Sequence, residues 1–486
     1  MSGFKKILKN KVMLYMLSRY ITYALQFIST LLIAVKLGPS DFGIWSFVLL
    51  IIGVFNIIDF GISNSANVFL VHDRKDEFLE GVHIKSIIVV NVILSILVCF
   101  FFVIGGTFDI PLLKKFQAEE YYFYIMAIVV LFYFNKSFAT VYRVKNRLLE
   151  VAFFQSAVPL LLFVSVIWIK RNLLHFLVWS YIVGYLFVFI VFLLGGKIST
   201  FGKFSIGDMI CLVKKGFWLF MYNSAFYLIM YLSSTQVSIW YSVEEFGKYN
   251  FSGTLANAVI LLVDAFSFIV FPKLIDRLSG KNYSQIVDTI RTIRLNYTTL
   301  INTLIYAILP FFYFFCIILP KYEDTGPTLC FAALAFAPYA AAFGINTFLI
   351  AQNREKRLSL ISISCLIFNT MLVFIMAYFF KVNYYYIYLC VATTNIMYTL
   401  FCTKQLFSEI GRKTTFKEVF TFAFPLRQVL PYTFAILCIG FAYSIEDPVV
   451  LTIPLAFYII LNWREYKEVI NSTRLIITNP SVIDLA

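Results

Sequence analysis

The feature that most constrains this chain is a series of long hydrophobic segments that recurs along its length. An α-helix needs about 20 mainly apolar residues to cross a bilayer, and 61% of the 486 residues are hydrophobic while only 14% are charged. We find fourteen such segments: 14–36, 44–68, 86–106, 121–143, 151–169, 173–194, 216–240, 249–271, 297–319, 327–351, 358–380, 384–403, 428–444 and 448–463. The sequence therefore predicts an all-α polytopic membrane protein with 14 transmembrane helices. It excludes a soluble enzyme, a nucleic-acid-binding protein and a secreted disulfide scaffold.

The distribution of basic residues indicates which loops face the cytoplasm. Most of the 40 Lys and Arg residues fall in alternate loops, on the side that holds the N-terminus. Because cytoplasmic loops are enriched in Lys and Arg, an even number of spans places both termini in the cytoplasm. The net charge of +14 then reflects topology and attraction to anionic lipid, with no nucleic acid partner.

The chain lacks the sequence features of a catalytic or cofactor-binding protein. Its eight cysteines and three histidines show no metal-ligand spacing. Its sequence has no Gly-x-x-x-x-Gly-Lys-Ser/Thr motif for a nucleotide phosphate, and its predicted outside loops are too short for a catalytic domain. We therefore expect a transporter that has no bound cofactor and no metal, and that is not an enzyme.

Two short motifs occur twice, at nearly the same spacing. An acid-Phe-Gly motif occupies 41–43 and 245–247, and an Asn-Arg pair occupies 146–147 and 353–354. Each pair of copies lies at corresponding points of the predicted topology, six spans apart, which indicates a parallel repeat. We therefore predict two six-helix lobes followed by two extra helices. Their bounds are 1–215 for the N-lobe, 216–410 for the C-lobe, and 411–486 for spans 13 and 14 with a cytoplasmic tail.

Charged and polar residues inside the spans predict a lumen between the lobes. Four charged residues lie roughly 9–14 Å from the predicted cytoplasmic ends of their helices, at ~1.5 Å per residue: Arg19, Asp59, Lys136 and Asp264. Polar residues at helical spacing extend this layer on spans 1, 2, 7 and 8: Tyr23, Gln26, Asn56, Asn223, Tyr227, Tyr231 and Asn257. Polar side chains in membrane helices face the protein interior or a water-filled cavity.

The types of these residues suggest their roles. Arg19 and Lys136 would attract an anionic substrate such as a phosphate, and the uncharged polar residues suit a hydroxyl-rich cargo. Asp59 and Asp264 would carry a coupling proton or sodium ion. The alternatives are that the polar residues only join helices, that Arg19 and Lys136 snorkel to the inner headgroups, or that Arg19 and Asp59 form a structural ion pair.

Four segments of the chain resemble a known family. They read Leu-Gly-Pro-Ser-Asp-Phe-Gly at 37–43, Ile-Asp-Phe-Gly-Ile at 58–62, Ser-Val-Glu-Glu-Phe-Gly-Lys-Tyr at 242–249 and Phe-Pro-Lys-Leu at 271–274. This pattern is similar to that of bacterial polysaccharide flippases, the Wzx-type exporters of lipid-linked oligosaccharides such as O-antigen units. These belong to the MOP superfamily, together with MATE drug transporters and lipid II flippases. The resemblance covers roughly residues 10–410.

The resemblance implies a MATE-like fold and a function. Such proteins move undecaprenyl-diphosphate-linked oligosaccharides from the inner to the outer leaflet of the bacterial cytoplasmic (inner) membrane by alternating access, driven by a proton or sodium gradient. Arg19 and Lys136 would then bind the diphosphate, and the uncharged polar residues the sugars. The implied partners are the lipid-linked glycan, the phospholipid bilayer, a glycan polymerase and glycosyltransferases. Two alternatives stay open, a MATE-type cation-coupled drug exporter and a membrane glycan polymerase or glycosyltransferase. The sugar, the coupling ion and the oligomeric state are not specified.

Overall fold

The computed structural model describes residues 11–58, 70, 77–196, 198, 205–258 and 283–467. The regular elements within these ranges are all helices. Nine of the described helices are long and apolar enough to cross a membrane, or ten if the bent pair Pro320–Ala340 and Ile345–Ala351 forms one span. The chain is thus an all-helical multi-pass membrane protein, as predicted, while the finer number of 14 spans stays a prediction.

The chain divides into two compact units, Met1–Gly247 and Lys248–Ala486. The first unit contains α2 (Lys11–Ile57), α4 (Glu77–Gly105), α5 (Pro111–Lys115), α6 (Tyr122–Val144), α7 (Leu148–Trp168), α8 (Leu173–Leu194) and α9 (Ile206–Trp240). Within it, α2 packs against α6, α7 and α9, and α4 packs against α6 and α9. A further helix spans 243–258, across the boundary of the units.

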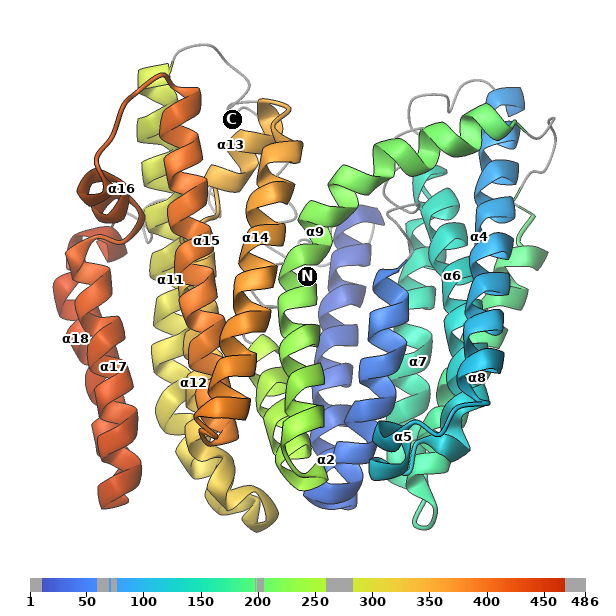
Figure 1. Ribbon diagram of the computed structural model, residues 1–486, viewed down its shortest axis with the longest axis horizontal. Helices are drawn as coiled ribbons and strands as arrows, with labels where there is room; N and C mark the ends of the chain where they lie inside the picture. The colour runs from blue at the N-terminus through green and yellow to red at the C-terminus, as the bar shows by residue number, and fades with distance from the viewer. Residues whose placement is uncertain are drawn as a thin grey trace, which may run out of the picture. The chain divides into compact units, whose positions relative to one another are not determined.

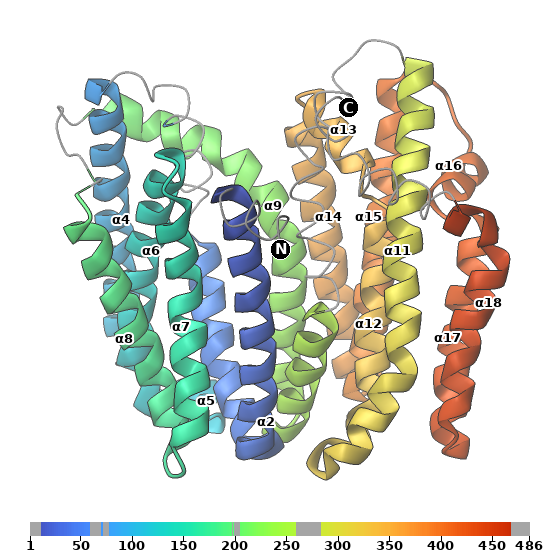
Figure 2. The same ribbon diagram turned by 180° about the vertical axis from the view of Figure 1, so that it is seen from behind.

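The second unit contains the remaining helices (Figure 1): α11 (Tyr283–Ile318), α12 (Gly326–Ala340), α13 (Ile345–Ala351), α14 (Glu355–Phe374), α15 (Ile387–Glu409), α16 (Phe416–Ala423), α17 (Leu426–Ile445) and α18 (Ile453–Leu461). Here α12 packs against α11, α15 and α17, and α17 lies beside α18 in both views (Figures 1 and 2). The units are defined by contacts, whereas the predicted lobes follow from the repeat, so the lobe boundary at 215/216 stays a prediction.

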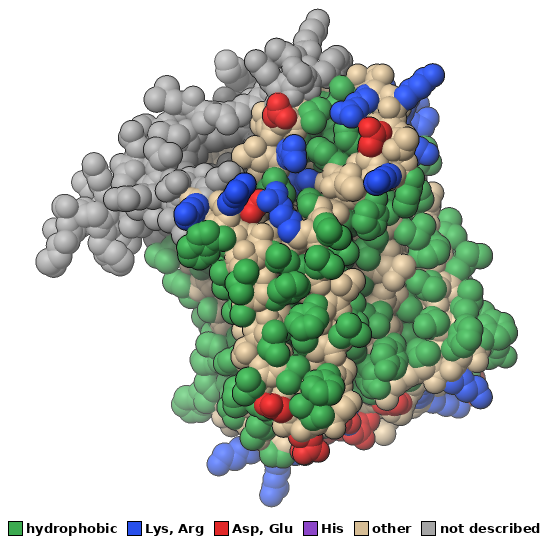
Figure 3. Space-filling view, turned by 90° about the vertical axis from the view of Figure 1, so that its left-hand side faces the viewer, with side chains coloured by type: hydrophobic (Ala, Val, Ile, Leu, Met, Phe, Trp, Pro, Cys, Tyr) green, Lys and Arg blue, Asp and Glu red, His purple; other side chains and the backbone are tan. Residues whose placement is uncertain are grey.

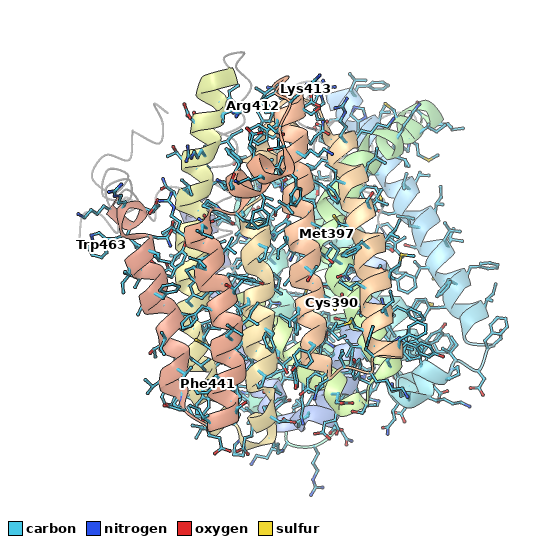
Figure 4. The ribbon with its side chains drawn as sticks, turned by 60° about the vertical axis from the view of Figure 1, so that its left-hand side comes forward. Cys390, Met397, Arg412, Lys413, Phe441 and Trp463 are labelled. Atoms are coloured by element: carbon cyan, nitrogen blue, oxygen red, sulfur yellow. The ribbon has the colours of Figure 1, made fainter. Side chains whose placement is uncertain are left out.

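The outer surface of the second unit matches a membrane environment. Figure 3 shows hydrophobic side chains across the middle of one face, with Lys and Arg side chains towards both ends. Figure 4 places Arg412 and Lys413 at an end of the bundle, and Phe441 far along α17 towards the other end. Phe441 and its neighbour Leu437 are more than half exposed. Exposed apolar helix faces of this kind contact lipid in a membrane-spanning protein.

Some helix bounds differ from the predicted spans. The predicted span 14–36 and the part of span 44–68 up to Ile57 both lie in α2, which is broken at Gly38 (φ 76°, ψ 173°) and restarts at Pro39. Residues 59–68 of the second span lie outside the described residues. This positive φ is accessible to Gly at little cost, and Pro fits the first turn of a helix. α11 begins at Tyr283, well before the predicted 297, because the helix continues through charged residues beyond its apolar part.

The repeated Asn-Arg pairs have the same structure in both units. Asn146 (φ 57°) follows α6 and Asn353 (φ 55°) follows α13, each in the left-handed conformation that Asn tolerates. The backbone N–H groups of Arg147 and Arg354 donate to the carbonyls five residues earlier, at 2.9 and 2.8 Å. This is the hydrogen bond of a Schellman motif. The repeated pair is therefore a helix C-cap in each copy.

The repeated acid-Phe-Gly motifs meet at a helix crossing. A Cβ atom at Gly247 would lie 2.2 Å from the carbonyl oxygen of Pro39 and 3.1 Å from the Cα of Gly43. A Cβ at Gly43 would lie 2.2 Å from the carbonyl oxygen of Val243. Since each of the 2.2 Å contacts is with a backbone oxygen, which no side-chain rotation relieves, the crossing requires Gly at both positions.

Near this crossing, hydrogen bonds join α5 to the C-terminal end of α9. The Lys115 ammonium donates to the carbonyls of Ser238, Ile239 and Tyr241 at 2.7, 3.3 and 2.6 Å. These carbonyls lie at the C-terminal end of α9, where backbone acceptors lack helical partners. Burial lowers the pKa of Lys115, and the charge of Glu245 acts in the opposite direction.

The bend after α12 has a local cause. Pro338 has no N–H for the carbonyl of Leu334, one turn earlier. The hydroxyl of Tyr432 on α17 donates to this carbonyl at 3.3 Å. Two side chains of α15 donate to neighbouring α12 carbonyls at 2.8 Å each. The predicted span 327–351 is therefore two helices, and the polar backbone groups at the bend are satisfied by other helices.

Candidate functional site

The predicted site residues that the structure describes lie mainly in the first unit. Arg19, Tyr23, Gln26 and Asn56 are on α2, Lys136 is on α6, and Tyr227 and Tyr231 are on α9. Asn257 lies in the helix 243–258 of the second unit, where it is partly buried. Asp59 and Asp264 lie outside the described residues, as does the side chain of Asn223.

Arg19 and Tyr23 form a pair along one face of α2. The Arg19 guanidinium donates to the Tyr23 hydroxyl and lies 5.3 Å from the centroid of the Tyr23 ring. The side chain thus reaches one turn forward along the helix, whereas snorkelling to the predicted cytoplasmic side would require it to reach back. Gln26, on the same face, is exposed. This face of α2 therefore presents a cation, a phenol and an amide together.

The second segment of α2 brings Asn56 close to α9. A Cβ atom at Gly53 would lie 2.3 Å from the ring of Tyr231, so this ring packs directly on the backbone of α2. Gly53 and Asn56 are one turn apart, which places Tyr231 and Asn56 on neighbouring parts of one helix face. The Oδ1 atom of Asn56 is buried and has no hydrogen-bond partner within the described part of the chain. It is an acceptor available to water or a ligand.

Lys136 lies beside an aromatic cluster on α6 and α8. Its ammonium is 5.8 Å from the ring centroid of Phe132, and Phe132 is 5.7 Å from Tyr185. The next residue before it, Asn135, is fully buried and donates from Nδ2 to the Tyr185 carbonyl at 2.8 Å. Lys136 itself is partly exposed. The cation therefore lies beside the Phe132 ring of its own helix, which in turn packs on Tyr185 of α8, and it is partly accessible.

α6 is also joined to α2 near Asn56. The Tyr133 hydroxyl donates to the carbonyl of Phe55 at 2.7 Å. Since α2 contacts α9 at Gly53 and α6 at Phe55, it brings the elements that carry Asn56, Tyr231 and Lys136 together. Sequence reasoning missed Asn135 and Tyr133, which position this part of the site. Their signal was a pair of polar side chains flanking Lys136 by one and three positions inside an apolar segment.

The chemistry of this part of the first unit is that of a polar, cationic surface. Tyr227 is 55% exposed on α9, and Gln26 is exposed on α2. Polar groups exposed on membrane-spanning helices need water or a polar ligand. Arg19 and Lys136 add two cations that suit an anion. Among the described residues, no group of three or more His, Cys, Asp or Glu side chains is arranged to hold a metal ion.

Comparison with known proteins then identifies the family. Residues 8–276, more than half of the chain, match the family described as "Polysaccharide biosynthesis protein". The chain belongs to this family. No curated protein matches the chain. This polysaccharide biosynthesis protein also has the fold of known MOP-superfamily transporters, as two solved structures show.

The first is a lipid II flippase MurJ in an inward closed conformation. It has 15% sequence identity, a TM-score of 0.67 and coverage of 94% of this chain and 99% of that one. The second is a multidrug resistance MATE family transporter of the MOP superfamily in an inward-facing conformation. It has 10% identity, a TM-score of 0.60 and coverage of 81% of this chain and 96% of that one. At these identities the likeness concerns the fold, and the MATE-like fold predicted from the sequence is confirmed.

Proposed function

We propose that this polysaccharide biosynthesis protein is a flippase for undecaprenyl-diphosphate-linked oligosaccharides. It would move repeat units such as those of O-antigen from the inner to the outer leaflet of the bacterial cytoplasmic membrane, with both chain termini in the cytoplasm. The family supports a role in polysaccharide synthesis, and the fold is shared with a protein named as a lipid II flippase. The observation that carries the proposal is the placement of Arg19 and Lys136 on helices of one unit, each next to aromatic and polar groups.

In this mechanism the diphosphate interacts with Arg19 and Lys136, while the polyprenyl tail stays in lipid. Arg offers several donors in a planar fork to phosphate oxygens, and Lys contributes a compact charge. The polar residues Tyr23, Gln26, Asn56, Tyr227 and Tyr231 would hydrogen-bond the sugars. Asn223 and Asn257 belong to the same proposed set. Asp59 and Asp264 are proposed to carry the coupling ion, a proton or sodium.

The test is surface glycan production in bacteria whose own copy of this protein is deleted. We expect the double variant R19A/K136A to abolish surface glycan at unchanged protein level, because both cations for the diphosphate are removed. The matched control is K114A, since Lys114 is an exposed residue that pairs with Asp109 at 2.6 Å on the surface. Normal glycan in the double variant would contradict the assigned roles. A glycan polymerase or glycosyltransferases would act with the flippase as partners.

A second candidate is a cation-coupled drug exporter, which the likeness to a multidrug MATE transporter favours. The two cations of the described site argue against it, since a cationic drug would be repelled. Overexpression in a drug-sensitive strain distinguishes the two functions. Resistance to a cationic dye such as ethidium, with no effect on surface glycan, would replace the flippase proposal.

A further inference from the structure

A line of polar residues runs along α11, outside the site proposed above. Arg294, Thr298, Asn302 and Tyr306 follow each other at every fourth position and so lie on one face of the helix. All four are more than nine-tenths buried. Buried polar residues in a membrane protein require partners. Arg294 is bound by α16, Thr298 by α17 and Asn302 by α18.

These contacts form what we call the polar seam, consisting of Arg294, Thr298, Asn302, Tyr306, Arg427, Gln428, Tyr458, Asn462 and Glu465. Gln428 Nε2 donates to Thr298 Oγ1 at 2.9 Å, and Asn302 Nδ2 donates to the Tyr458 hydroxyl at 3.4 Å. Asn462 Nδ2 donates to the Arg427 carbonyl at 3.1 Å. The seam thus joins the two C-terminal helices to α11.

The seam contains an acid, Glu465, for which the described residues supply a partner on one carboxylate oxygen. Glu465 is 5% exposed, and its Oε1 atom forms an ion pair with Arg427. Its Oε2 atom is buried and has no hydrogen-bond partner among the residues that the structure describes. The same holds for Asn302 Oδ1, Asn462 Oδ1, the Tyr306 hydroxyl and Arg294 Nε. Several unpaired polar atoms along one interface indicate positions for ordered water.

A second glutamate of the same unit, Glu409, has hydrogen-bond partners on both of its carboxylate oxygens and serves as a comparison. Glu409 accepts from Arg354 Nε at 2.8 Å on Oε2, and from Arg357 at 2.7 Å and Gln405 at 2.6 Å on Oε1. Its side chain is 9% exposed, close to the 7% of Glu465. The two acids therefore differ mainly in their partners, because within the described part of the chain Glu465 has a partner, Arg427, on Oε1 alone.

The charged groups around Glu465 allow its ion pair with Arg427 to break and form again. From α17 it faces Arg427, whose side chain is 35% exposed. From α11, Arg294 lies near both Arg291 and Arg427. Arg294 donates to the Phe422 carbonyl and lies 4.5 Å from the Phe422 ring.

On its own segment, Glu465 faces the phenol of Tyr458, while Arg464 and Lys467 are exposed. The phenol of Tyr466 bonds to Thr303 of α11. Among these groups Arg427 is the one that both neutralises Glu465 and can turn to water, since its side chain is partly exposed.

We propose that Glu465 is a proton-binding site at which a proton and the Arg427 guanidinium alternate as the partner of the carboxylate. A hydronium ion gives its proton to Oε2 and leaves as water, so that Glu465 becomes a neutral carboxylic acid. Arg427 keeps its charge and turns to solvent, and the net charge of the seam rises by one. Water bound at Asn302, Asn462 and Tyr306 supplies the path along the interface.

The role of this site in transport rests on the proposed function, but proton binding does not. If the flippase is proton-coupled, Glu465 would bind the proton in the second unit, whereas Arg19 and Lys136 belong to the first. Release of Arg427 would break the ion pair between the start of α17 and the segment that follows α18. The structure thus assigns proton binding to the C-terminal region that lies outside the predicted six-plus-six repeat.

The direct test is pH-difference infrared spectroscopy of the purified full-length protein in lipid, in the region of the protonated-carboxyl stretch. We expect a band that appears on acidification in the wild type and is lost in E465Q but kept in E409Q. In R427Q the band should appear at a higher pH, because the competing cation is gone. If E465Q does not fold, the R427Q shift carries the test. Identical spectra in wild type and E465Q, or an unshifted band in R427Q, would overturn the proposal.

A transport experiment separates this inference from the proposed function. Proteoliposomes with an internal pH dye would receive undecaprenyl-diphosphate-linked N-acetylglucosamine, and both proton uptake and glycolipid movement would be measured. We expect both in the wild type and in E409Q, and loss of proton uptake in E465Q. Glycolipid movement with proton uptake unchanged in E465Q would refute the coupling role of Glu465 alone. Absence of glycolipid movement in the wild type would refute the flippase function and leave the infrared result standing.

Discussion

The crossing of the two acid-Phe-Gly motifs gives a sharp prediction for Gly247→Ala. The new Cβ would lie 2.2 Å from the Pro39 carbonyl oxygen and 3.1 Å from the Gly43 Cα, so the helices must separate. Overpacking of this kind costs about 1–3 kcal/mol. Because a backbone oxygen cannot rotate away, we expect an overpacking cost at the upper end of this range, about 3 kcal/mol. The better helix propensity of Ala returns about 1 kcal/mol, which leaves a destabilisation of about 2 kcal/mol.

The measurement is thermal unfolding of the purified full-length protein in detergent, followed by helical circular dichroism. For a unit of this size, about 2 kcal/mol corresponds to a Tm lower by about 4–8 °C. The matched control is Gly440→Ala on α17, where a Cβ would meet no atom within 4 Å, and where we expect an unchanged or higher Tm. The effects of G43A and G247A should not add, because both act at one crossing. An unchanged Tm for G247A, or an equal loss for G440A, would refute the close-packing argument.

Three further predictions concern the ends of helices. Lys115→Met should destabilise the protein by about 1–2 kcal/mol, since charged hydrogen bonds to the end of α9 are lost, while the exposed Lys114→Met should have no measurable effect; thermal unfolding compares them. Hydrogen bonds from Thr415, chiefly its backbone N–H, lower the pKa of Glu418. The stability that Glu418 contributes is therefore present above the ordinary carboxyl pKa and lost as the pH falls through the depressed value. The Tm difference between wild type and E418Q should disappear in acid, and a difference that persists there would contradict this. Asn146→Ala and Asn353→Ala should each lower the Tm, because Ala is strained at positive φ, whereas Gly at either position should keep it.

The positions of the helices follow from the sequence to a large extent, because a membrane span requires a long apolar segment. The predicted segment 86–106 lies within α4 except for its last residue, and 173–194 coincides with α8. Hydropathy is continuous across the bend between α12 and α13, so the apolar pattern alone does not locate it. Its cause is local: Pro338 removes a donor, and Gly344 takes a positive φ of 73°.

The candidate site was predictable in its residue types but not in its contacts. Polar spacing picked out Asn56 and Tyr231, yet their proximity depends on the ring of Tyr231 packing on Gly53, which no local pattern encodes. The polar seam was missed for a different reason. Arg294 lies before the predicted start of its span at 297, so it was counted with the loop. A search for polar residues at every fourth position, continued beyond the apolar segment, would have joined it to Asn302.

Because of the bend of α12, α17 is needed to satisfy a backbone carbonyl inside the second unit. Because Tyr432 supplies the hydrogen that Pro338 cannot give to the Leu334 carbonyl, a truncated protein ending before residue 426 would leave that oxygen bare in hydrocarbon. Such a truncation should therefore yield a misassembled second unit instead of a minimal twelve-helix transporter.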